Sequence, residues 1–405
     1  MRILWTLPYL PWPTTSGGKT RQYHLLRCLA ARGHRITLLV QTKDQLDDTT
    51  RATLEPLLER LIVLPRRPLR HPLTVLGGLC APWPLMASIN GLAPSLQTTF
   101  AALLQEPWDA VQIEHSYSFQ PFAEPLAQAA LPFLLTEHNL ESDLGAATYS
   151  RFPRWSLPFT RFDQWRARRW ERQVLGRASL VVAVTEEDGA RMAPLTTRPP
   201  QVVVNGVDCQ AFASVQADPR SQRVLFVGNY EYAPNRDAVA WALNSIFPRL
   251  WRRCPHARFA VAGYALPADW PTRWPDPRIE WLGFVPTLSE LQGRCAVFLA
   301  PLRHGGGSKL KVLEALAGGL PLVSTAQGVS GLRLRNGHEY RAADTAQQLA
   351  AALELLLSQH PTAHRLGEAG RAYVRQHHDW PTAAAQLEQV YQRLAPPERR
   401  VMPCA

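Results

Sequence analysis

Short apolar strands and helical segments alternate along most of this chain, and this alternation restricts the fold more than any other feature. The first unit runs from a buried-type strand, Arg2–Leu7, through a long loop to a helix that begins near Lys19, and then to the strand 35–40. Apolar residues recur at helical spacing in the helix, whereas both strands are largely apolar runs. Strand, helix and strand in this order predict a parallel sheet covered by helices, the α/β class.

The alternation continues in two halves that join near residue 210. A length of 405 residues is sufficient for two domains of ordinary size. We therefore predict two Rossmann-like domains with parallel sheets that face a central cleft. The expected bounds are 1–208 for the N-terminal domain, 209–221 for a linker, 222–380 for the C-terminal domain, and 381–405 for a terminal helix and tail. The helix 380–394 either crosses back to the first domain or belongs wholly to the second.

Further elements follow from the same patterns. Strands are expected at 60–64, 110–114, 133–136, 179–185, 223–228, 258–262, 279–282 and 296–300, and helices at 47–59, 237–253, 343–357 and 364–377.

Charge and cysteine content restrict the class of protein and its surroundings. A net charge of +11 is compatible with nucleic acid, an anionic membrane surface or phosphorylated substrates. The six cysteines form no CxxC pair and no metal-type spacing with histidine, which is typical of reduced thiols. The first residues lead into a loop rather than a secretory signal, and no apolar run reaches the length of a membrane span. We expect a cytoplasmic protein that is soluble or peripheral on the inner membrane face.

A glycine turn between a strand and a helix is the strongest candidate for a binding site. The strand 296–300 precedes Gly305, Gly306 and Gly307, and apolar residues resume at helical spacing from Leu310. Ser308 is the predicted N-cap. Glycines at the positive end of a helix let an anionic group approach backbone N–H groups, so this turn predicts a phosphate site. The glycines alone leave an ordinary turn equally open.

Three charged residues follow this turn. Lys309 and Lys311 would supply the cations that a diphosphate needs. Glu314 lies on the same helix face as Lys311, and a carboxylate close to phosphate is repelled unless it bonds a neutral group. We therefore assign Glu314 to hydroxyl groups of a ribose or a sugar.

The whole string GGGSKLKVLEALAGGLPLVST resembles the donor-binding segment of the family 4 glycosyltransferases, retaining enzymes of the GT-B fold. VVVNGVD at 202–208 is similar to the family's marker at the end of the N-terminal domain. The strings VAGY and WLGFVP also resemble the family, so nearly the full chain is covered. The family carries two glutamates eight positions apart, and Gly306 stands where the first, which contacts the transferred sugar, would be.

This resemblance implies further donor-binding residues. The loop with Gly17 and Gly18 would hold the donor phosphates or the acceptor. The turn after the strand 223–228 would bind diphosphate, with Gly228 in the turn and Arg236 as its only cation. The two following turns would border the nucleotide base, and the residues concerned are Gly263, Phe284 and Val285. The segment Gly17–Thr20 is not a P-loop, because Pro13 stands where that motif requires glycine.

Polar clusters follow two strands of the first half, Glu114–Tyr117 after one and Glu137–Asn139 after the next. In open parallel sheets ligands bind at the carboxyl ends of strands, so both clusters should lie at one edge. A lone histidine is usually structural. The string TEHN, however, resembles the family's acceptor-side segment, which implies that His138 contacts the transferred sugar. His115, Tyr117 and Asn139 are assigned to the acceptor side.

Two basic stretches allow several interpretations. Arg66, Arg67, Arg70 and His71 precede the apolar run 73–92, which would rest on an anionic membrane or pack on its own domain as an irregular segment. The stretch 151–172 interleaves arginine with aromatic residues. It predicts an amphipathic helix first, membrane contact second and nucleic-acid binding third.

Together these features predict a retaining glycosyltransferase that moves a sugar from a nucleoside-diphosphate donor to a glycan or lipid-linked acceptor, in cell-surface polysaccharide biosynthesis. No metal ion is required if cations and a helix N-terminus neutralise the leaving diphosphate. Three alternatives stay open. They are a nucleotide-sugar epimerase of the same fold, a catalytically silent sugar- or partner-binding subunit, which the missing carboxylate at Gly306 favours, and a basic nucleic-acid-binding protein.

Overall fold

The computed structural model describes residues 1–405 except 68–70, 92, 141, 143–155, 306–308 and 395–405. The chain forms two compact units. One contains Met1–Val204 together with the chain from Ala383 onward, and the other contains Asn205–Thr382. The division therefore falls slightly before the predicted domain end at 208.

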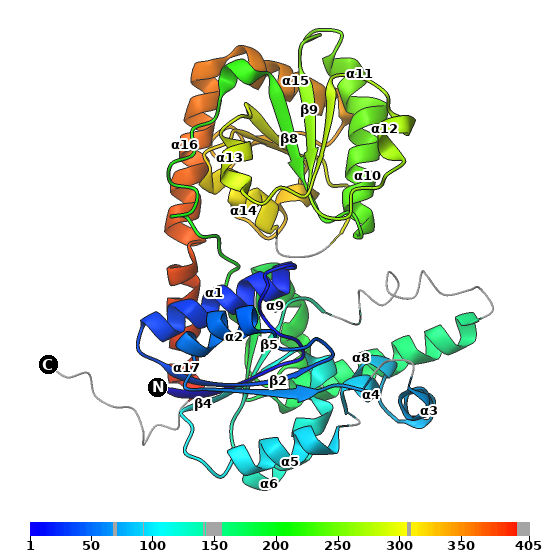
Figure 1. Cartoon of the computed structure of the whole chain (residues 1–405), viewed down its shortest axis with the longest axis vertical. Helices are drawn as coiled ribbons and strands as arrows, with labels where there is room; N and C mark the ends of the chain where they lie inside the picture. The colour runs from blue at the N-terminus through cyan, green and yellow to red at the C-terminus, as the bar shows by residue number, and fades with distance from the viewer. Residues whose placement is uncertain (68–70, 92, 141, 143–155, 306–308, 395–405) are drawn as a thin grey trace, which may run out of the picture. The chain divides into compact units, whose positions relative to one another are not determined.

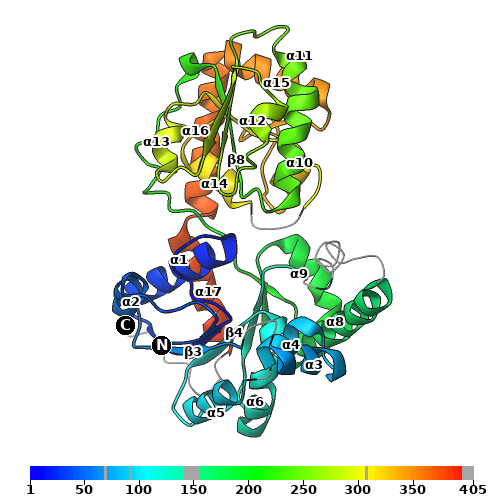
Figure 2. The same ribbon diagram turned by 45° about the vertical axis from the view of Figure 1, so that its right-hand side comes forward.

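Among the described residues, the first unit contains a seven-stranded parallel sheet in the order β3-β2-β1-β4-β5-β6-β7. Buried strands of this kind are continuous apolar runs, because helices cover both faces of the sheet. Helices α1 and α17 lie on one face, and α5 and α6 lie on the other (Figures 1 and 2). The strands are β1 Arg2–Leu7, β2 Arg35–Thr42, β3 Arg60–Pro65, β4 Ala110–Glu114, β5 Leu134–Glu137, β6 Leu180–Ala183 and β7 Gln201–Val202.

Helix starts in this unit follow local capping. Ser16 caps the first helix by accepting from the backbone N–H of Lys19, and Thr185 caps a helix whose first turn is acidic. The predicted helix 47–59 is shorter, since an α-helix gives way to a 3-10 turn at Glu55–Leu57. The helices are α1 Gly17–Ala31, α2 Asp48–Leu54, α3 Pro72–Cys80, α4 Leu85–Gly91, α5 Pro94–Leu103, α6 Ala123–Ala129, α8 Leu157–Arg177 and α9 Glu186–Met192.

The second unit contains a six-stranded parallel sheet within the described chain, in the order β10-β9-β8-β11-β12-β13. Its strands are β8 Arg223–Val227, β9 Arg258–Ala262, β10 Ile279–Gly283, β11 Val297–Ala300, β12 Leu322–Ser324 and β13 Arg341–Ala342. Two α/β units with parallel sheets confirm the predicted fold class.

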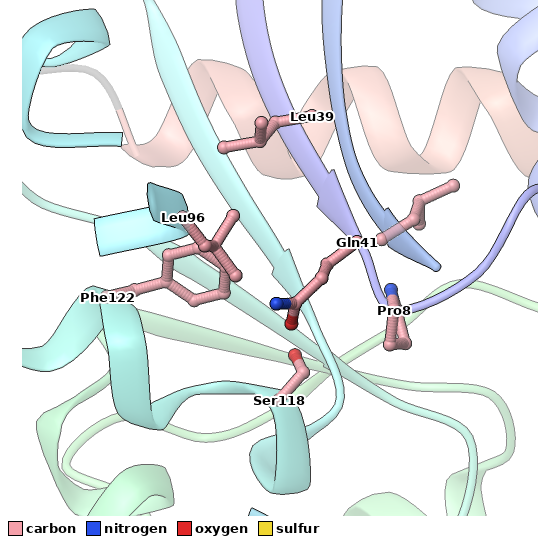
Figure 3. A pocket seen from close by; sticks show the side chains of 7 residues that line it. Pro8, Leu39, Gln41, Leu96, Ser118 and Phe122 are labelled. Atoms are coloured by element: carbon pink, nitrogen blue, oxygen red, sulfur yellow. The ribbon is translucent and has the colours of Figure 1, made fainter. Parts of the chain in front are cut away.

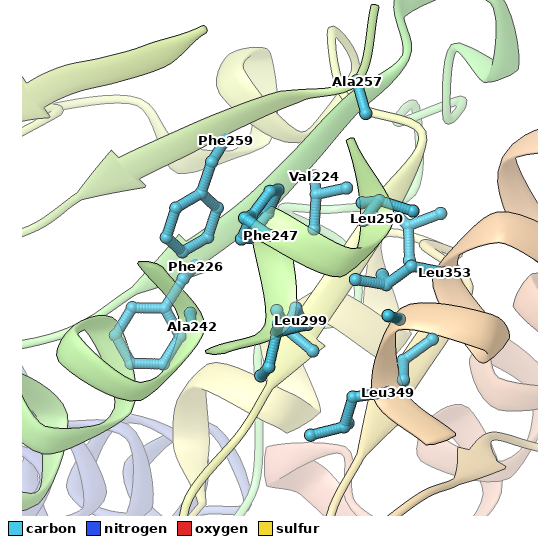
Figure 4. Packing of buried hydrophobic residues seen from close by; sticks show 14 of the residues in the cluster. Val224, Phe226, Ala242, Phe247, Leu250, Ala257, Phe259, Leu299, Leu349 and Leu353 are labelled. Carbon is cyan, nitrogen blue, oxygen red and sulfur yellow. The ribbon is translucent and has the colours of Figure 1, made fainter. Parts of the chain in front are cut away.

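Both faces of the second sheet are packed. Phe226 and Val224 of β8 point to one core with Phe247, and Figure 4 shows this cluster between the sheet and its helices. Leu225, the residue between them, belongs to the opposite core. The helices of this unit are α10 Ala233–Trp241, α11 Phe247–Leu250, α12 Trp270–Arg273, α13 Leu288–Gln292, α14 Leu310–Ala317, α15 Ala346–Ser358 and α16 His360–His377, and α17 Trp380–Leu394 begins at its end. A π-helical stretch, Ala242–Ile246, connects α10 to α11.

Helix α17 crosses back to the first unit, which was one of the two alternatives predicted for it. Its residues from Ala383 belong to that unit. The Tyr391 hydroxyl donates to Gln112 of β4, and Glu388 accepts from Arg32 and lies 3.0 Å from His34 Nε2. The last helix thus completes one face of the first sheet.

Strand order reverses between β1 and β4 in the first sheet and between β8 and β11 in the second. Ligands of open α/β sheets bind beside such reversals, at the carboxyl ends of the strands. The residues that follow β1, β4 and β5, and those that follow β8 and β11, are therefore where functional side chains are expected.

Candidate active site

A buried carboxylate and a histidine meet at the ends of β4 and β5. Glu114 Oε2 lies 3.2 Å from His138 Nε2, and its Oε1 accepts from Trp5 Nε1 at 3.1 Å and from Gln112 Nε2 at 2.7 Å. Burial opposes ionisation of Glu114, but the hydrogen bond and charge of His138 outweigh it and lower the pKa to about 2. Glu114 is therefore a carboxylate that fixes the orientation of the His138 ring.

His115 lies beside this pair as a neutral ring. Burial, followed by the charge of His138, lowers the pKa of His115 to about 3. Its ring packs edge-to-face on His138 at 4.5 Å between centroids and stacks on Tyr117 at 4.8 Å. The backbone φ of His115 is 64°, in the left-handed region that non-glycine residues rarely adopt, and such conformations cluster at functional sites.

The amino end of α1 approaches the same cluster. A Cβ on Gly18 would lie 2.6 Å from the Tyr9 hydroxyl and 3.5 Å from His138 Nδ1. Tyr9 in turn lies 3.3 Å from His115 Nε2. Glycine at this position thus lets the backbone of α1 approach the Nδ1 side of His138. The structure brings together Gly17, Gly18, His115, Tyr117 and His138, whereas Asn139 follows as a half-buried residue.

Glu114, His115 and His138 also offer three ligand atoms within 4.8 Å of one another, as a metal site would. The carboxylate of Glu114, however, already accepts from Trp5 and Gln112, and Gln22 Nε2 lies 3.4 Å from its second oxygen. These donors occupy lone pairs of the carboxylate that a cation would need, so the arrangement fits a histidine held by a hydrogen-bonded carboxylate better than a cation site.

A pocket in the same unit lies beyond the ends of β1 and β2 (Figure 3). Its only polar side chains are Gln41 and Ser118, and no charged residue lines it. A pocket of this kind does not suit a diphosphate. It is lined by Leu7, Pro8, Leu39, Gln41, Leu96, Ser118 and Phe122.

In the second unit, α14 begins differently from the prediction. Lys309 occupies the N-cap position with φ 50° and makes no side-chain cap hydrogen bond, so Ser308 is not the N-cap. Lys309 has a left-handed φ and not a helical one, so the first helical residue is Leu310. Gly306, Gly307 and Ser308 lie outside the described residues, and the phosphate-binding role expected of them stays a prediction.

Gly305 requires glycine for two reasons. Its φ is 108°, and a Cβ would lie 2.8 Å from both the Tyr232 hydroxyl and Pro234 Cγ. Its carbonyl accepts from Gln327 Nε2 at 2.6 Å, and Lys309 Nζ lies 3.4 Å away. The turn is thus contacted by the segment after β12, by α10 and by the N-cap residue of α14.

Lys311 and Glu314 are half-buried charged residues on α14. Lys311 Nζ donates to Asn235 Oδ1 and lies 4.8 Å from the centre of the Phe226 ring. Burial, and then the charge of Lys309, lower the pKa of Lys311 to about 7. Burial raises the pKa of Glu314 to about 7, against the opposing charge of Lys311. Both groups are therefore poised to change charge near neutral pH when a ligand binds.

Gly228 and Gly263 pack the turns that follow β8 and β9. A Cβ on Gly263 would lie 1.8 Å from the Gly228 carbonyl oxygen, and a Cβ on Gly228 would lie 3.0 Å from Asn235 Nδ2. The structure thus gives both glycines a packing role at the site's edge, and it holds Asn235 against Lys311.

Exposed side chains surround this edge. Phe284 follows β10 and is 71% exposed, Val285 is half-buried, and Arg236 is exposed on α10. Tyr232 and Tyr264 are also exposed, and the sequence analysis missed both. Asn235 was not predicted either, and Glu114 was placed in the strand-end cluster without a role of its own. The signal that could have found Tyr264 is an aromatic residue directly after a glycine turn, and Tyr232 lies in the loop that follows Gly228.

Comparison with known proteins identifies the class. A family model described as "Glycosyl transferase 4-like domain" matches residues 16–208, and one described as "Glycosyl transferases group 1" matches residues 221–359. The two matches together leave only the chain's ends and a short linker unmatched. The chain belongs to the family 4 glycosyltransferases with the GT-B fold, and it is an enzyme of this class, which confirms the resemblance seen in the sequence.

Individual relatives are distant. A Klebsiella pneumoniae protein described as an uncharacterized 44.6 kDa protein in the cps region is 22% identical over 340 residues, which cover 81% of this chain and 84% of that protein. Sucrose-phosphate synthase from Thermosynechococcus elongatus superposes with a TM-score of 0.70 at 18% identity, over 97% of this chain and 99% of that one. Anabaena HepE, solved with UDP and glucose, superposes with a TM-score of 0.65 at 16% identity, over 96% and 99%.

Proposed function

We propose that this glycosyltransferase transfers a sugar, with retention of anomeric configuration, from a nucleoside-diphosphate donor to a glycan or lipid-linked acceptor in cell-surface polysaccharide biosynthesis. HepE has been solved with UDP and with UDP-glucose, which supports a nucleotide-sugar donor. The Klebsiella relative belongs to a cps region, which supports a polysaccharide role.

The observation that carries the donor assignment is the arrangement around α14. Lys309 and Lys311 place two ammonium groups at the amino end of a helix, where a diphosphate is stabilised. Glu314, with its raised pKa, is suited to bond donor hydroxyl groups. The exposed Phe284 and Tyr264 are suited to stack on a nucleotide base.

In the proposed reaction the acceptor hydroxyl oxygen bonds the anomeric carbon while the bond from that carbon to the diphosphate oxygen breaks. The acceptor proton passes to the leaving phosphate. His138 binds a hydroxyl group of the transferred sugar, and Glu114 keeps its ring in position. His115, Tyr117 and Asn139 form the acceptor side. The lysines and the amino end of α14 neutralise the leaving group without a metal ion, so EDTA should leave the rate unchanged.

The test is a panel of UDP, GDP and ADP sugars, measured first by thermal stabilisation and then by sugar transfer. One nucleotide should stabilise the protein, and Lys309→Ala and Glu314→Ala should abolish that shift. Glu290→Gln, an exposed carboxylate on α13, serves as the matched control. Conversion of the donor without any acceptor would indicate an epimerase. Binding of a nucleotide sugar without sugar transfer would indicate a catalytically silent subunit. Thermal stabilisation by an oligonucleotide and by none of the nucleotides would exclude the donor site.

A further inference from the structure

Helix α8 exposes large apolar side chains. Trp165 is 55% exposed and Phe162 is 51% exposed, and their rings stack at 5.8 Å between centroids. Leu157, one turn before Phe162, is exposed as well. Water contact of this much adjacent apolar surface is unfavourable, and such patches mark interaction sites.

The same side of α8 is uniformly basic. Arg161, Arg168, Arg169 and Arg172 are exposed, whereas the two acids of the helix, Asp163 and Glu171, are buried. Asp163 is paired with Arg166 inside the unit. The exposed side of α8 therefore carries positive charge and no carboxylate.

The apolar surface continues onto a neighbouring helical hairpin. Arg166 donates to the carbonyls of Gly78 at 3.0 Å and Ala81 at 2.8 Å, which fixes the end of α3 against α8. The backbone N–H of Leu85, at the start of α4, donates to Asp163 at 3.0 Å. Figures 1 and 2 show α3 and α4 beside α8 in both views.

Three large apolar side chains of this hairpin are exposed among those that the structure describes. Leu76 on α3 is 57% exposed, and Leu79 and Met86 are exposed too. Neither helix contains an acidic residue. We define the exposed sides of α3, α4 and α8 as the α8 face.

We propose that the α8 face is a docking surface for an anionic lipid bilayer. Its apolar side chains would enter the boundary between headgroups and acyl chains, while the arginines of α8 pair with lipid phosphates. Tryptophan is favoured at the boundary between membrane and water. The Arg169 guanidinium lies over the Trp165 ring, 5.9 Å from its centre, so both side chains can lie at that boundary together. Among the described residues, no helix is long and apolar enough to cross a membrane.

The composition of the α8 face favours lipid over the other partners of a basic surface. Single-stranded nucleic acid would stack on Phe162 and Trp165, but Leu76, Leu79 and Met86 offer it no stacking surface. A second copy of this chain would bring four arginines against four others, which is repulsive. An anionic bilayer satisfies both the aliphatic and the cationic parts of the face.

This proposal does not rest on the donor site, and it is tested with the full chain by co-sedimentation with vesicles. We expect binding to phosphatidylcholine vesicles that contain phosphatidylglycerol, and much weaker binding to pure phosphatidylcholine. Each arginine near an anionic surface contributes about fivefold in partitioning, so Arg168→Gln with Arg169→Gln should weaken binding about 25-fold. Arg249→Gln with Arg252→Gln changes the net charge equally on exposed residues of the second unit and should leave binding unchanged.

The apolar part has its own test. Phe162→Ser with Trp165→Ser should weaken binding at high salt, where the arginine contribution is screened. An unchanged thermal midpoint shows that these variants fold. The proposal would be overturned if Arg168→Gln with Arg169→Gln bound vesicles as well as the control variant Arg249→Gln with Arg252→Gln. Equal binding of the wild type to vesicles with and without phosphatidylglycerol would overturn it too. The proposal would also be overturned if the wild type were a dimer and the double variant Phe162→Ser with Trp165→Ser were a monomer. The α8 face would then be an interface between two copies of the chain.

Discussion

His138 Nε2 lies 3.2 Å from Glu114 Oε2, so the ring is held from the carboxylate side and its Nδ1 lies toward Gly18. A hydrogen bond to a charged group contributes about 1.5–3 kcal/mol. Replacing Glu114 by Gln keeps the shape and removes the charge. We expect Glu114→Gln to lower kcat about 10- to 100-fold with a smaller change in KM.

Steady-state transfer kinetics together with the thermal midpoint measure this effect. Glu388→Gln is the control, because Glu388 is also a paired carboxylate of the first unit but lies beside Arg32 and His34. If the two variants lost activity equally, and in proportion to stability, Glu114 would have no positioning role.

His115 should make the protein sensitive to acid. Its pKa is about 3 in the folded state against the ordinary 6.5, so below pH 6.5 the unfolded chain binds a proton that the folded protein does not. The free energy of unfolding should therefore fall by about 1.4 kcal/mol for each pH unit between 6.5 and 3 on account of this residue. Denaturant unfolding of the wild type and of His115→Asn across this range measures it, and the variant should show the shallower slope.

Lys311 should make donor binding depend on pH. With its pKa lowered to about 7, the side chain is charged below neutral pH and loses its proton above it. Nucleotide affinity should thus fall as pH rises through 7 in the wild type and show less change in Lys311→Met. Calorimetric titration at pH 6 and 8.5 tests this, and parallel pH profiles for the two proteins would contradict it.

Glu314 should tolerate glutamine better than alanine. A carboxyl with a pKa near 7 is partly protonated at neutral pH, so a neutral amide can replace its hydrogen bonds to hydroxyl groups. We expect Glu314→Ala to lower kcat/KM about 100-fold and Glu314→Gln less than tenfold. Equal losses would show that the charge, and not the hydrogen bond, is what the donor requires.

Gly263→Ala should destabilise the second unit. The added Cβ would lie 1.8 Å from the Gly228 carbonyl oxygen, and the φ of 132° disfavours any side chain. We expect a loss of about 3 kcal/mol or more in the free energy of unfolding. Gly293→Ala is the matched control, because its φ is −62° and the nearest contact of a Cβ is 3.6 Å.

The sequence was sufficient for most of the fold. The strands Arg2–Leu7, Ala110–Glu114 and Arg258–Ala262 have the predicted bounds, because each is a short, mainly apolar run next to polar or glycine residues. Helix starts were predicted too late where proline occupies the first turn, as in α10, which begins at Ala233. The apolar run 73–92, which had no clear period, forms the helices α3 and α4.

The candidate site was predicted less completely. Strand-end clusters and the glycine turn located His138 and Lys309 from local patterns. The partners that fix the site lie far along the chain, however. Asn235 and Lys311 are 76 residues apart, and Trp5 and Glu114 are 109 apart. Such contacts depend on the packing of side chains between neighbouring strands, which a local pattern does not specify.

Helix α17 determines the order in which the molecule can be completed. Residues 1–204 are synthesised first, but Gln112, His34 and Val204 find partners on a helix that leaves the ribosome only after all of the second unit. Until then the face of the first sheet that α1 and α17 share lacks the part that α17 covers. The second unit can therefore fold during translation, whereas the first can complete its fold only after α17 has been synthesised.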